Sequence, residues 1–123
     1  MYIDVLTGCN NRRFYEERLK DTTVNAGVAF IDIDDFKLYN DVYGHAAGDD
    51  ILRAIGSCIR RCIRPDDSLV RYGGDEFIAI FPGAERGELL DILDSIRENV
   101  AAVTSFMVSL SDITAPILND SVT

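Results

Sequence analysis

Residues 68–81 read SLVRYGGDEFIAIF, a stretch in which two apolar segments flank a Gly-Gly pair that is followed by two acids. The segments 68–72 and 77–81 are β-prone and are separated by turn residues, so they predict a β-hairpin. Glycine and acidic residues are common in exposed turns, which is one explanation of the sequence. A second explanation is a site where the backbone approaches a phosphate while a carboxylate binds a metal.

Length and charge restrict the class of protein. The chain has 123 residues, of which 47% are hydrophobic and 27% charged, and its net charge is −9. This length corresponds to a single globular domain, residues 1–123, that can bury a core. A surface that binds nucleic acid polymers would need clustered Lys and Arg, which the acidic balance disfavours. A phosphorylated small molecule stays compatible with it, because bound Mg²⁺ reconciles an acidic site with an anionic ligand.

The cysteines and the N-terminus indicate a cytoplasmic location. Cys9, Cys58 and Cys62 are an odd number and too sparse for a disulfide framework. Cys58 and Cys62 have a spacing that a metal site would tolerate, but with His45 as the single histidine we expect buried thiols in a reducing compartment. The N-terminal MYIDVLTG lacks the basic region of a signal peptide, and no apolar run approaches the roughly 20 residues of a membrane helix.

The order of the predicted elements is β-α-β-β-α-β, preceded by a small helix. Around the hairpin we expect helices at 11–19, 48–63 and 85–101 and strands at 26–33 and 106–110. This order predicts an α+β fold with a ferredoxin-like core and a mainly antiparallel sheet, the arrangement of polymerase palms and nucleotidyl cyclases. In that topology the carboxyl end of strand 26–33 lies at the hairpin turn. We therefore expect Asp32 and Asp34 beside Asp75 and Glu76.

Carboxylates from two neighbouring strands, beside a glycine turn, are what two-metal phosphoryl transfer requires. Metals held there clamp the phosphate, neutralise its charge and lower the pKa of an attacking hydroxyl. Glycines let the backbone come close to the phosphate. The predicted convergence of these carboxylates therefore favours a functional site over a solvated turn.

The stretch RYGGDEF at residues 71–77 resembles the signature of GGDEF domains, the diguanylate cyclases that make cyclic di-GMP from two GTP. Other blocks match in the same order. Residues 4–8 (DVLTG) and 11–14 (NRRF) resemble the family's N-terminal block, and residues 32–37 (DIDDFK), 40–45 (NDVYGH) and 47–49 (AGD) resemble its metal and nucleotide block. The resemblance covers roughly residues 4–110.

The resemblance implies a role for particular residues. Asp32, Asp75 and the carbonyl of Ile33 would ligate Mg²⁺ or Mn²⁺, and Glu76 would act with Asp75 in catalysis. The implied GTP-binding set is Phe36 and Lys37 at the triphosphate, Asn40 and Asp49 at the guanine edge, and Gly73 and Gly74 at the phosphates. An amide and a carboxylate suit guanine, whose O6 accepts and whose N1–H and N2–H₂ donate. The family also implies a homodimer that is fused to, or controlled by, a sensor domain.

Several of these residues have a plain structural explanation. Asn40 is equally explained as a helix cap, Asp49 as an acid favoured at a helix N-terminus, and Lys37 as a solvated charge. We expect His45 to be a packing or hydrogen-bonding residue rather than a catalyst.

A separate motif at residues 64–67 (RPDD) matches the family's Arg-x-x-Asp inhibitory site. The resemblance implies that Arg64 and Asp67 bind the product, cyclic di-GMP. An arginine can pair with a phosphate or stack on guanine, and an aspartate can accept from a guanine edge. A helix end followed by a turn explains the same residues.

The resemblance ends before the family's last strand and its last helix, which carries basic residues that contact the triphosphate. Ser109-Leu110-Ser111 stands where the family has a glycine turn, and no Lys or Arg follows Arg97. A fragment of a longer protein and a degenerate domain both explain this difference. We expect a diguanylate cyclase with weakened GTP binding and turnover. The alternatives are a regulatory module that binds GTP or cyclic di-GMP and a protein–protein domain that binds no nucleotide.

Overall fold

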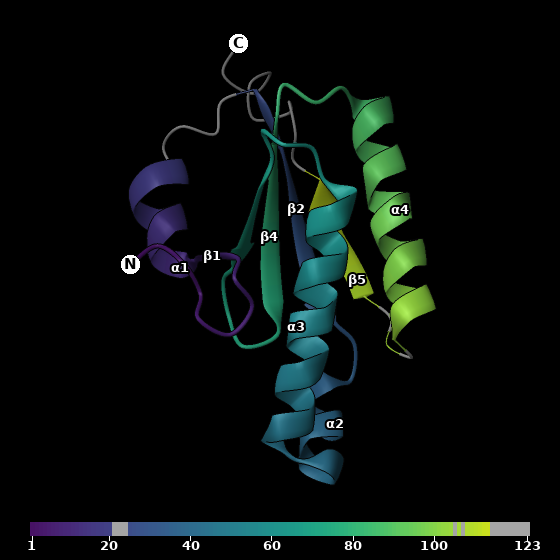
Figure 1. The fold of residues 1–123 in the computed structure, drawn as a ribbon. Helices are drawn as coiled ribbons and strands as arrows, with labels where there is room; N and C mark the ends of the chain where they lie inside the picture. The colour runs from purple at the N-terminus through teal and green to yellow at the C-terminus, as the bar shows by residue number, and fades with distance from the viewer. Residues whose placement is uncertain (21–24, 105, 107, 114–123) are drawn as a thin grey trace.

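The computed structural model describes residues 1–20, 25–104, 106 and 108–113. Within these residues the chain forms a five-stranded sheet with strand order β1-β3-β4-β2-β5 (Figure 1). The β1–β3 pair is parallel and the other pairs are antiparallel. In chain order the strands are β1 (Asn10–Asn11), β2 (Ala26–Ile33), β3 (Ser68–Arg71), β4 (Glu76–Pro82) and β5 (Val108–Ile113). The predicted α+β fold is confirmed, and β5 begins and ends later than the predicted 106–110.

The helices include one that the sequence did not predict. They are α1 (Arg12–Phe14), the π-helical turn η1 (Tyr15–Leu19), α2 (Phe36–Tyr43), α3 (His45–Cys62) and α4 (Arg86–Val103). The unpredicted helix is α2. It lacks the usual side-chain cap, because Asp35 before it has a left-handed backbone (φ 58°) and its side chain caps nothing. Gly44 ends it with φ 92° and donates its N–H to the carbonyl of Asn40 at 2.8 Å.

The two faces of the sheet are covered differently. Alternating residues of β2 and β4 face α3 and α4, which lie together on one side in Figure 1 and bury the main core. Ile31, Phe77, Ile55, Ile59 and Ile96 are all almost fully buried there. The opposite face carries Val28, Val70, Ile78 and Ile80, against which Phe14, Tyr15 and Leu19 pack. Within the described residues, the end of this second face near Asp32 borders a cavity.

The register of the central strands confirms the predicted position of Asp32. Asp32 is opposite Glu76 in the β2–β4 pair, and the N–H of Ile33 donates to the carbonyl of Asp75 at 3.3 Å. Asp34 is exposed just after β2. The carboxyl end of β2 and the hairpin turn therefore meet at one end of the sheet.

The expected buried thiols are found at Cys9 and Cys58, whereas Cys62 is half-buried. None of the helices in the described ranges is both long and apolar enough to cross a bilayer.

Candidate functional site

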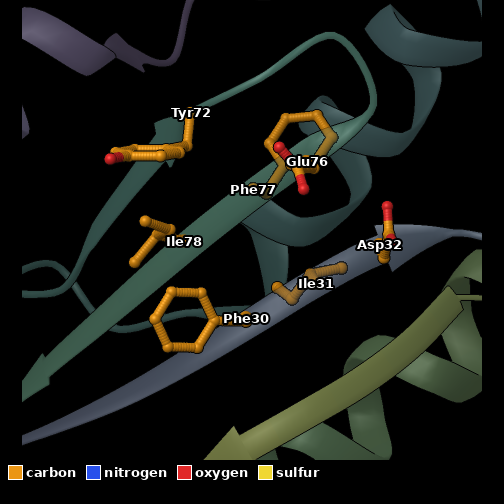
Figure 2. A pocket seen from close by; sticks show the side chains of 7 residues that line it. All are labelled: Phe30, Ile31, Asp32, Tyr72, Glu76, Phe77 and Ile78. Atoms are coloured by element: carbon orange, nitrogen blue, oxygen red, sulfur yellow. The ribbon is translucent and has the colours of Figure 1, made fainter.

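Asp32 and Glu76 lie at one end of a cavity on the open face of the sheet, which we call the sheet-face cavity. Its volume is about 350 Å³, and it is lined by Phe30, Ile31, Asp32, Tyr72, Glu76, Phe77 and Ile78. Figure 2 shows the two carboxylates together at one end, with Phe30, Tyr72 and Ile78 at the other. Burial raises the pKa of Asp32, and the negative charges of Asp75 and Glu76 raise it further. The three carboxylates thus repel one another.

These acids are suited to a divalent cation. Carboxylate and carbonyl oxygens are the ligands that Mg²⁺ and Mn²⁺ prefer. Among the described residues, no Lys or Arg forms an ion pair with Asp32, Asp75 or Glu76. The described residues do not present a ready-made cluster of three metal-binding side chains. The negative charges of Asp75 and Glu76 nevertheless contribute to the raised pKa of Asp32, and a bound cation would reduce this repulsion. The oxygen ligands present at this site therefore fit a divalent cation.

A second opening, which we call the α2–α3 cleft, collects most of the predicted GTP-binding residues. Its volume is also about 350 Å³, and α2, α3 and the hairpin turn contribute to it. It is lined by Phe36, Lys37, Asn40, His45, Asp49, Leu52, Arg71, Gly74 and Asp75. His45 is exposed, so it does not pack in the core. The predicted residues thus fall mainly into two neighbouring cavities, because Asp75 lines the α2–α3 cleft and the adjacent Glu76 lines the sheet-face cavity, whereas Ile33 and Gly73 line neither of the two.

Asn40 carries a buried polar atom with no partner. Its Oδ1 is buried and accepts no hydrogen bond from any residue that the structure describes. A buried acceptor in this state costs roughly 1–3 kcal/mol. The side chain lies against Gly48 of α3, where an added Cβ would overlap the Asn40 amide. Gly48 therefore lets Asn40 keep its place at the cleft, a role that the sequence reasoning missed.

The two glycines of the turn act differently. Tyr72 and Gly73 both donate their N–H groups to the carbonyl of Glu76, at 2.8 Å and 3.3 Å. A Cβ at Gly73 would overlap the carboxylate of Glu76, whereas one at Gly74 would meet open space. Gly74 lines the α2–α3 cleft, and Gly73 instead lets the Glu76 side chain lie back over the turn.

Arg71 was not predicted as a site residue. It donates from Nη2 and Nε to the carbonyl of Gly74 at 2.9 Å and 3.3 Å. It also pairs with both carboxylate oxygens of Asp4 at 3.3 Å. The sequence offered one signal, since Arg71 and Asp4 both stand in motifs that resemble the family.

Arg64 and Asp67 lie apart from both cavities and pair with each other. Arg64 Nη2 lies 2.8 Å from Oδ1 of Asp67, whose side chain is fully buried. The same guanidinium donates to Glu88 at 3.1 Å and to the carbonyl of Pro82 at 3.0 Å. The adjacent pocket, about 550 Å³ in volume, is lined by Arg64, Glu85, Gly87, Glu88, Asp91 and Ile92. Through its hydrogen bond to Pro82, Arg64 also joins the end of α3 to the end of β4.

Comparison with known proteins identifies the relatives of this chain. The profile of the family described as diguanylate cyclase, GGDEF domain, matches residues 1–115. Diguanylate cyclase DgcS of Shewanella oneidensis is 38% identical over a 117-residue alignment that covers 88% of this chain and 40% of that protein. Diguanylate cyclase DosC of Escherichia coli is 39% identical over a 105-residue alignment that covers 80% of this chain and 23% of that protein. The chain thus spans less than half the length of these curated relatives.

Solved structures show the same fold. The GGDEF domain of DgcB from Caulobacter crescentus, in complex with c-di-GMP, matches with a TM-score of 0.81 at 30% identity, covering 89% of this chain and 74% of that one. Diguanylate cyclase SiaD of Pseudomonas aeruginosa, in complex with its activator SiaC, matches with a TM-score of 0.83 at 29% identity, covering 88% and 47%.

Proposed function

The chain belongs to the GGDEF family of diguanylate cyclase domains, and from this premise we propose that it condenses two GTP into cyclic di-GMP and two pyrophosphates. The observation that carries the proposal is the α2–α3 cleft, which gathers Phe36, Lys37, Asn40, Asp49, Gly74 and Asp75 from distant parts of the chain. Its volume of about 350 Å³ lies within the range of small-molecule sites.

Asn40 and Asp49 are proposed to read the base. The Oδ1 of Asn40, which has no partner among the described residues and lies buried against Gly48, accepts an N–H of the base once the amide turns toward the cleft, and the Asp49 carboxylate accepts another. Guanine offers N1–H and N2–H₂ on one edge, whereas the corresponding N1 of adenine is an acceptor. An adenine here would leave the acceptor of Asn40 unsatisfied, so the cleft favours GTP over ATP.

The reaction requires two loaded protomers. The 3′-hydroxyl of one GTP attacks the α-phosphorus of the other, which forms an O–P bond and breaks the bond to the departing pyrophosphate. The symmetric attack closes the ring. Glu76, the first residue of β4, and Asp75 just before it are proposed to hold the hydroxyl and take up its proton.

Asp32, Asp75 and the carbonyl of Ile33 are proposed to hold Mg²⁺ or Mn²⁺. A cation held by these residues would neutralise the phosphates and ease deprotonation of the hydroxyl. Lys37 and Phe36, at the start of α2, are proposed to meet the triphosphate.

The test is detection of cyclic di-GMP by mass spectrometry after the protein is incubated with GTP and Mg²⁺. We expect a product whose rate of formation rises more than linearly with protein concentration, because two protomers must meet. Asp75→Ala should abolish it, and Asp94→Asn on the far helix α4 is the control that should not. If the wild type binds GTP but yields no product at high concentration, turnover by this chain is refuted.

A second candidate function is a receptor for cyclic di-GMP that acts through Arg64 and Asp67. A related GGDEF domain was solved with c-di-GMP, which favours this candidate. Arg64 already pairs with Glu88, and Glu85 and Asp91 also line the pocket, so a phosphodiester would have to displace a carboxylate. Calorimetry should therefore show tighter binding in Glu88→Gln and weaker binding in Arg64→Lys. Equal affinity in all three proteins would refute the assignment.

A further inference from the structure

We propose that Arg71 is a positioning residue that couples the turn bearing Asp75 to the N-terminal turn around Asp4. The inference rests on the proposed function, in which Asp75 binds the cation and the reacting hydroxyl. Arg71 itself binds neither the cation nor the hydroxyl in this proposal. Its contacts hold Asp75 in place before a ligand binds.

The peptide groups on both sides of Asp75 are held by hydrogen bonds. Arg71 donates twice to the carbonyl of Gly74, which belongs to the peptide group entering Asp75. The carbonyl of Asp75 itself accepts from the N–H of Ile33 in β2 at 3.3 Å. Gly74 has no Cβ to restrict its backbone, so the hydrogen bonds from Arg71 are what fix that peptide plane. Without them, the Asp75 carboxylate would lose its fixed direction.

Arg71 is in turn held by the N-terminal turn. Its Nη1 pairs with both oxygens of Asp4, and the two side chains are only 19% and 20% exposed. Asp4 accepts hydrogen bonds from the backbone N–H and the hydroxyl of Thr7, at 2.8 Å and 2.7 Å. Its backbone closes the same turn through Cys9 and Gly8, at 2.7 Å and 2.8 Å. A partly buried pair held this way is more rigid than an exposed one.

The charge state of Asp4 supports this connection. Burial alone would raise the pKa of Asp4, but the hydrogen bonds from Thr7 and the charge of Arg71 outweigh it and lower that pKa. Asp4 is therefore ionised at neutral pH and keeps its charge opposite Arg71.

The alternative role for Arg71 is direct contact with a ligand, because it also lines the α2–α3 cleft and carries a positive charge there. Direct contact with a bound phosphate would need Arg71 but not Asp4, which is not among the residues that line the cleft. Positioning needs both. Variants of Asp4 therefore separate the two roles.

The experiment is a double-mutant cycle on Asp4→Asn and Arg71→Lys, with Asp94→Asn as the matched control. Asp94 forms a comparable pair with Arg97 at 2.9 Å, but it is exposed and lies on α4. For each protein we would measure kcat, KM for GTP and the backbone amide NMR signals of Gly74 and Asp75 without nucleotide. Thr7→Val, which removes one hydrogen bond to Asp4, replaces Asp4→Asn if the latter does not fold.

If Arg71 positions the turn, either single substitution lowers kcat by between about tenfold and a hundredfold, with a smaller change in KM. The double variant should then be little worse than either single one, because the two residues act as a unit. The amide signals of Gly74 and Asp75 should move in both singles and stay in place in Asp94→Asn. An Asp4→Asn protein with wild-type kcat and unmoved amide signals would overturn the proposal.

Failure of the proposed function gives a different result. A wild-type protein that makes no product refutes turnover but leaves the amide signals measurable. In that case movement of the Gly74 and Asp75 signals in both single variants supports the positioning role, and unmoved signals refute it.

Discussion

Replacing Gly48 by Ala tests how the α2–α3 cleft holds Asn40, the side chain proposed to read the base. Gly48 is buried within α3, and an added Cβ would overlap the Asn40 amide and come within 3.2 Å of the Phe36 ring. Two effects on stability oppose each other. Alanine is favoured over glycine within a helix by about 0.8–1 kcal/mol. Turning the Asn40 side chain away costs about 0.5–1.5 kcal/mol.

The free energy of unfolding should therefore change by less than about 1 kcal/mol, whereas nucleotide binding should suffer clearly. A displaced Asn40 no longer accepts from guanine, and a lost hydrogen bond to a buried group costs about 1–3 kcal/mol, roughly a factor of 5 to 150 in affinity. Calorimetry with a non-hydrolysable GTP analogue measures the affinity, and urea denaturation measures the stability. Discrimination between GTP and ATP should fall together with the affinity for GTP.

The matched control is Gly56→Ala in the same helix. A Cβ there would meet Cys9 and Thr7 at 3.4 Å, an ordinary contact, so binding should stay unchanged. Undiminished GTP affinity in Gly48→Ala would refute the role given to Asn40. A loss of more than about 2 kcal/mol of stability would show that the neighbours cannot move aside, contrary to the reasoning above.

Three further predictions concern charged groups. Asp4→Asn should lower the free energy of unfolding by about 1 kcal/mol at neutral pH, because folding lowers the pKa of Asp4. The deficit should fade as the pH falls below about 4 and through that lowered pKa, and urea titrations that show a pH-independent deficit would contradict it. Asp32→Asn should instead raise the free energy of unfolding, because folding raises the pKa of the Asp32 carboxyl. Without metal it should stabilise the protein by less than about 1 kcal/mol at neutral pH and by nothing once wild-type Asp32 is protonated, while Mn²⁺ affinity falls. Arg64→Ala should cost about 3 kcal/mol, because it leaves the fully buried Asp67 carboxylate without its guanidinium, and a loss below about 1 kcal/mol in denaturation experiments would show that the pair contributes little.

The sequence was informative where apolar patterns were strong. The alternating and continuous apolar runs of β2 and β4 predicted these strands to within a residue or two, and the hairpin topology predicted that Asp32 meets Glu76. It failed at α2, where Asp35 adopts a left-handed backbone instead of the usual cap. It also missed β1, because two asparagines carry no strand preference and pair only through their backbone with β3.

The site was less predictable than the fold. Resemblance to the family pointed to Asn40 and Asp49, and the structure places both at one cleft. Resemblance did not reveal that Gly48 makes room for Asn40, or that Arg71 holds the carbonyl of Gly74. Both depend on close side-chain contacts that spacing along the chain does not encode.

The short helix α2 has a consequence for the exchange of ligand. Phe36 is its single buried residue, although it carries Lys37 and Asn40, while Asp32 belongs to β2, an interior strand paired on both sides. Amide hydrogen exchange should therefore be faster in α2 than in β2, because opening this helix disturbs little of the core. Nucleotide binding should slow exchange in α2 far more than in the strands. The residence time of the nucleotide would then be governed by the fraying of one small helix, while the carboxylates stay in place for the next encounter.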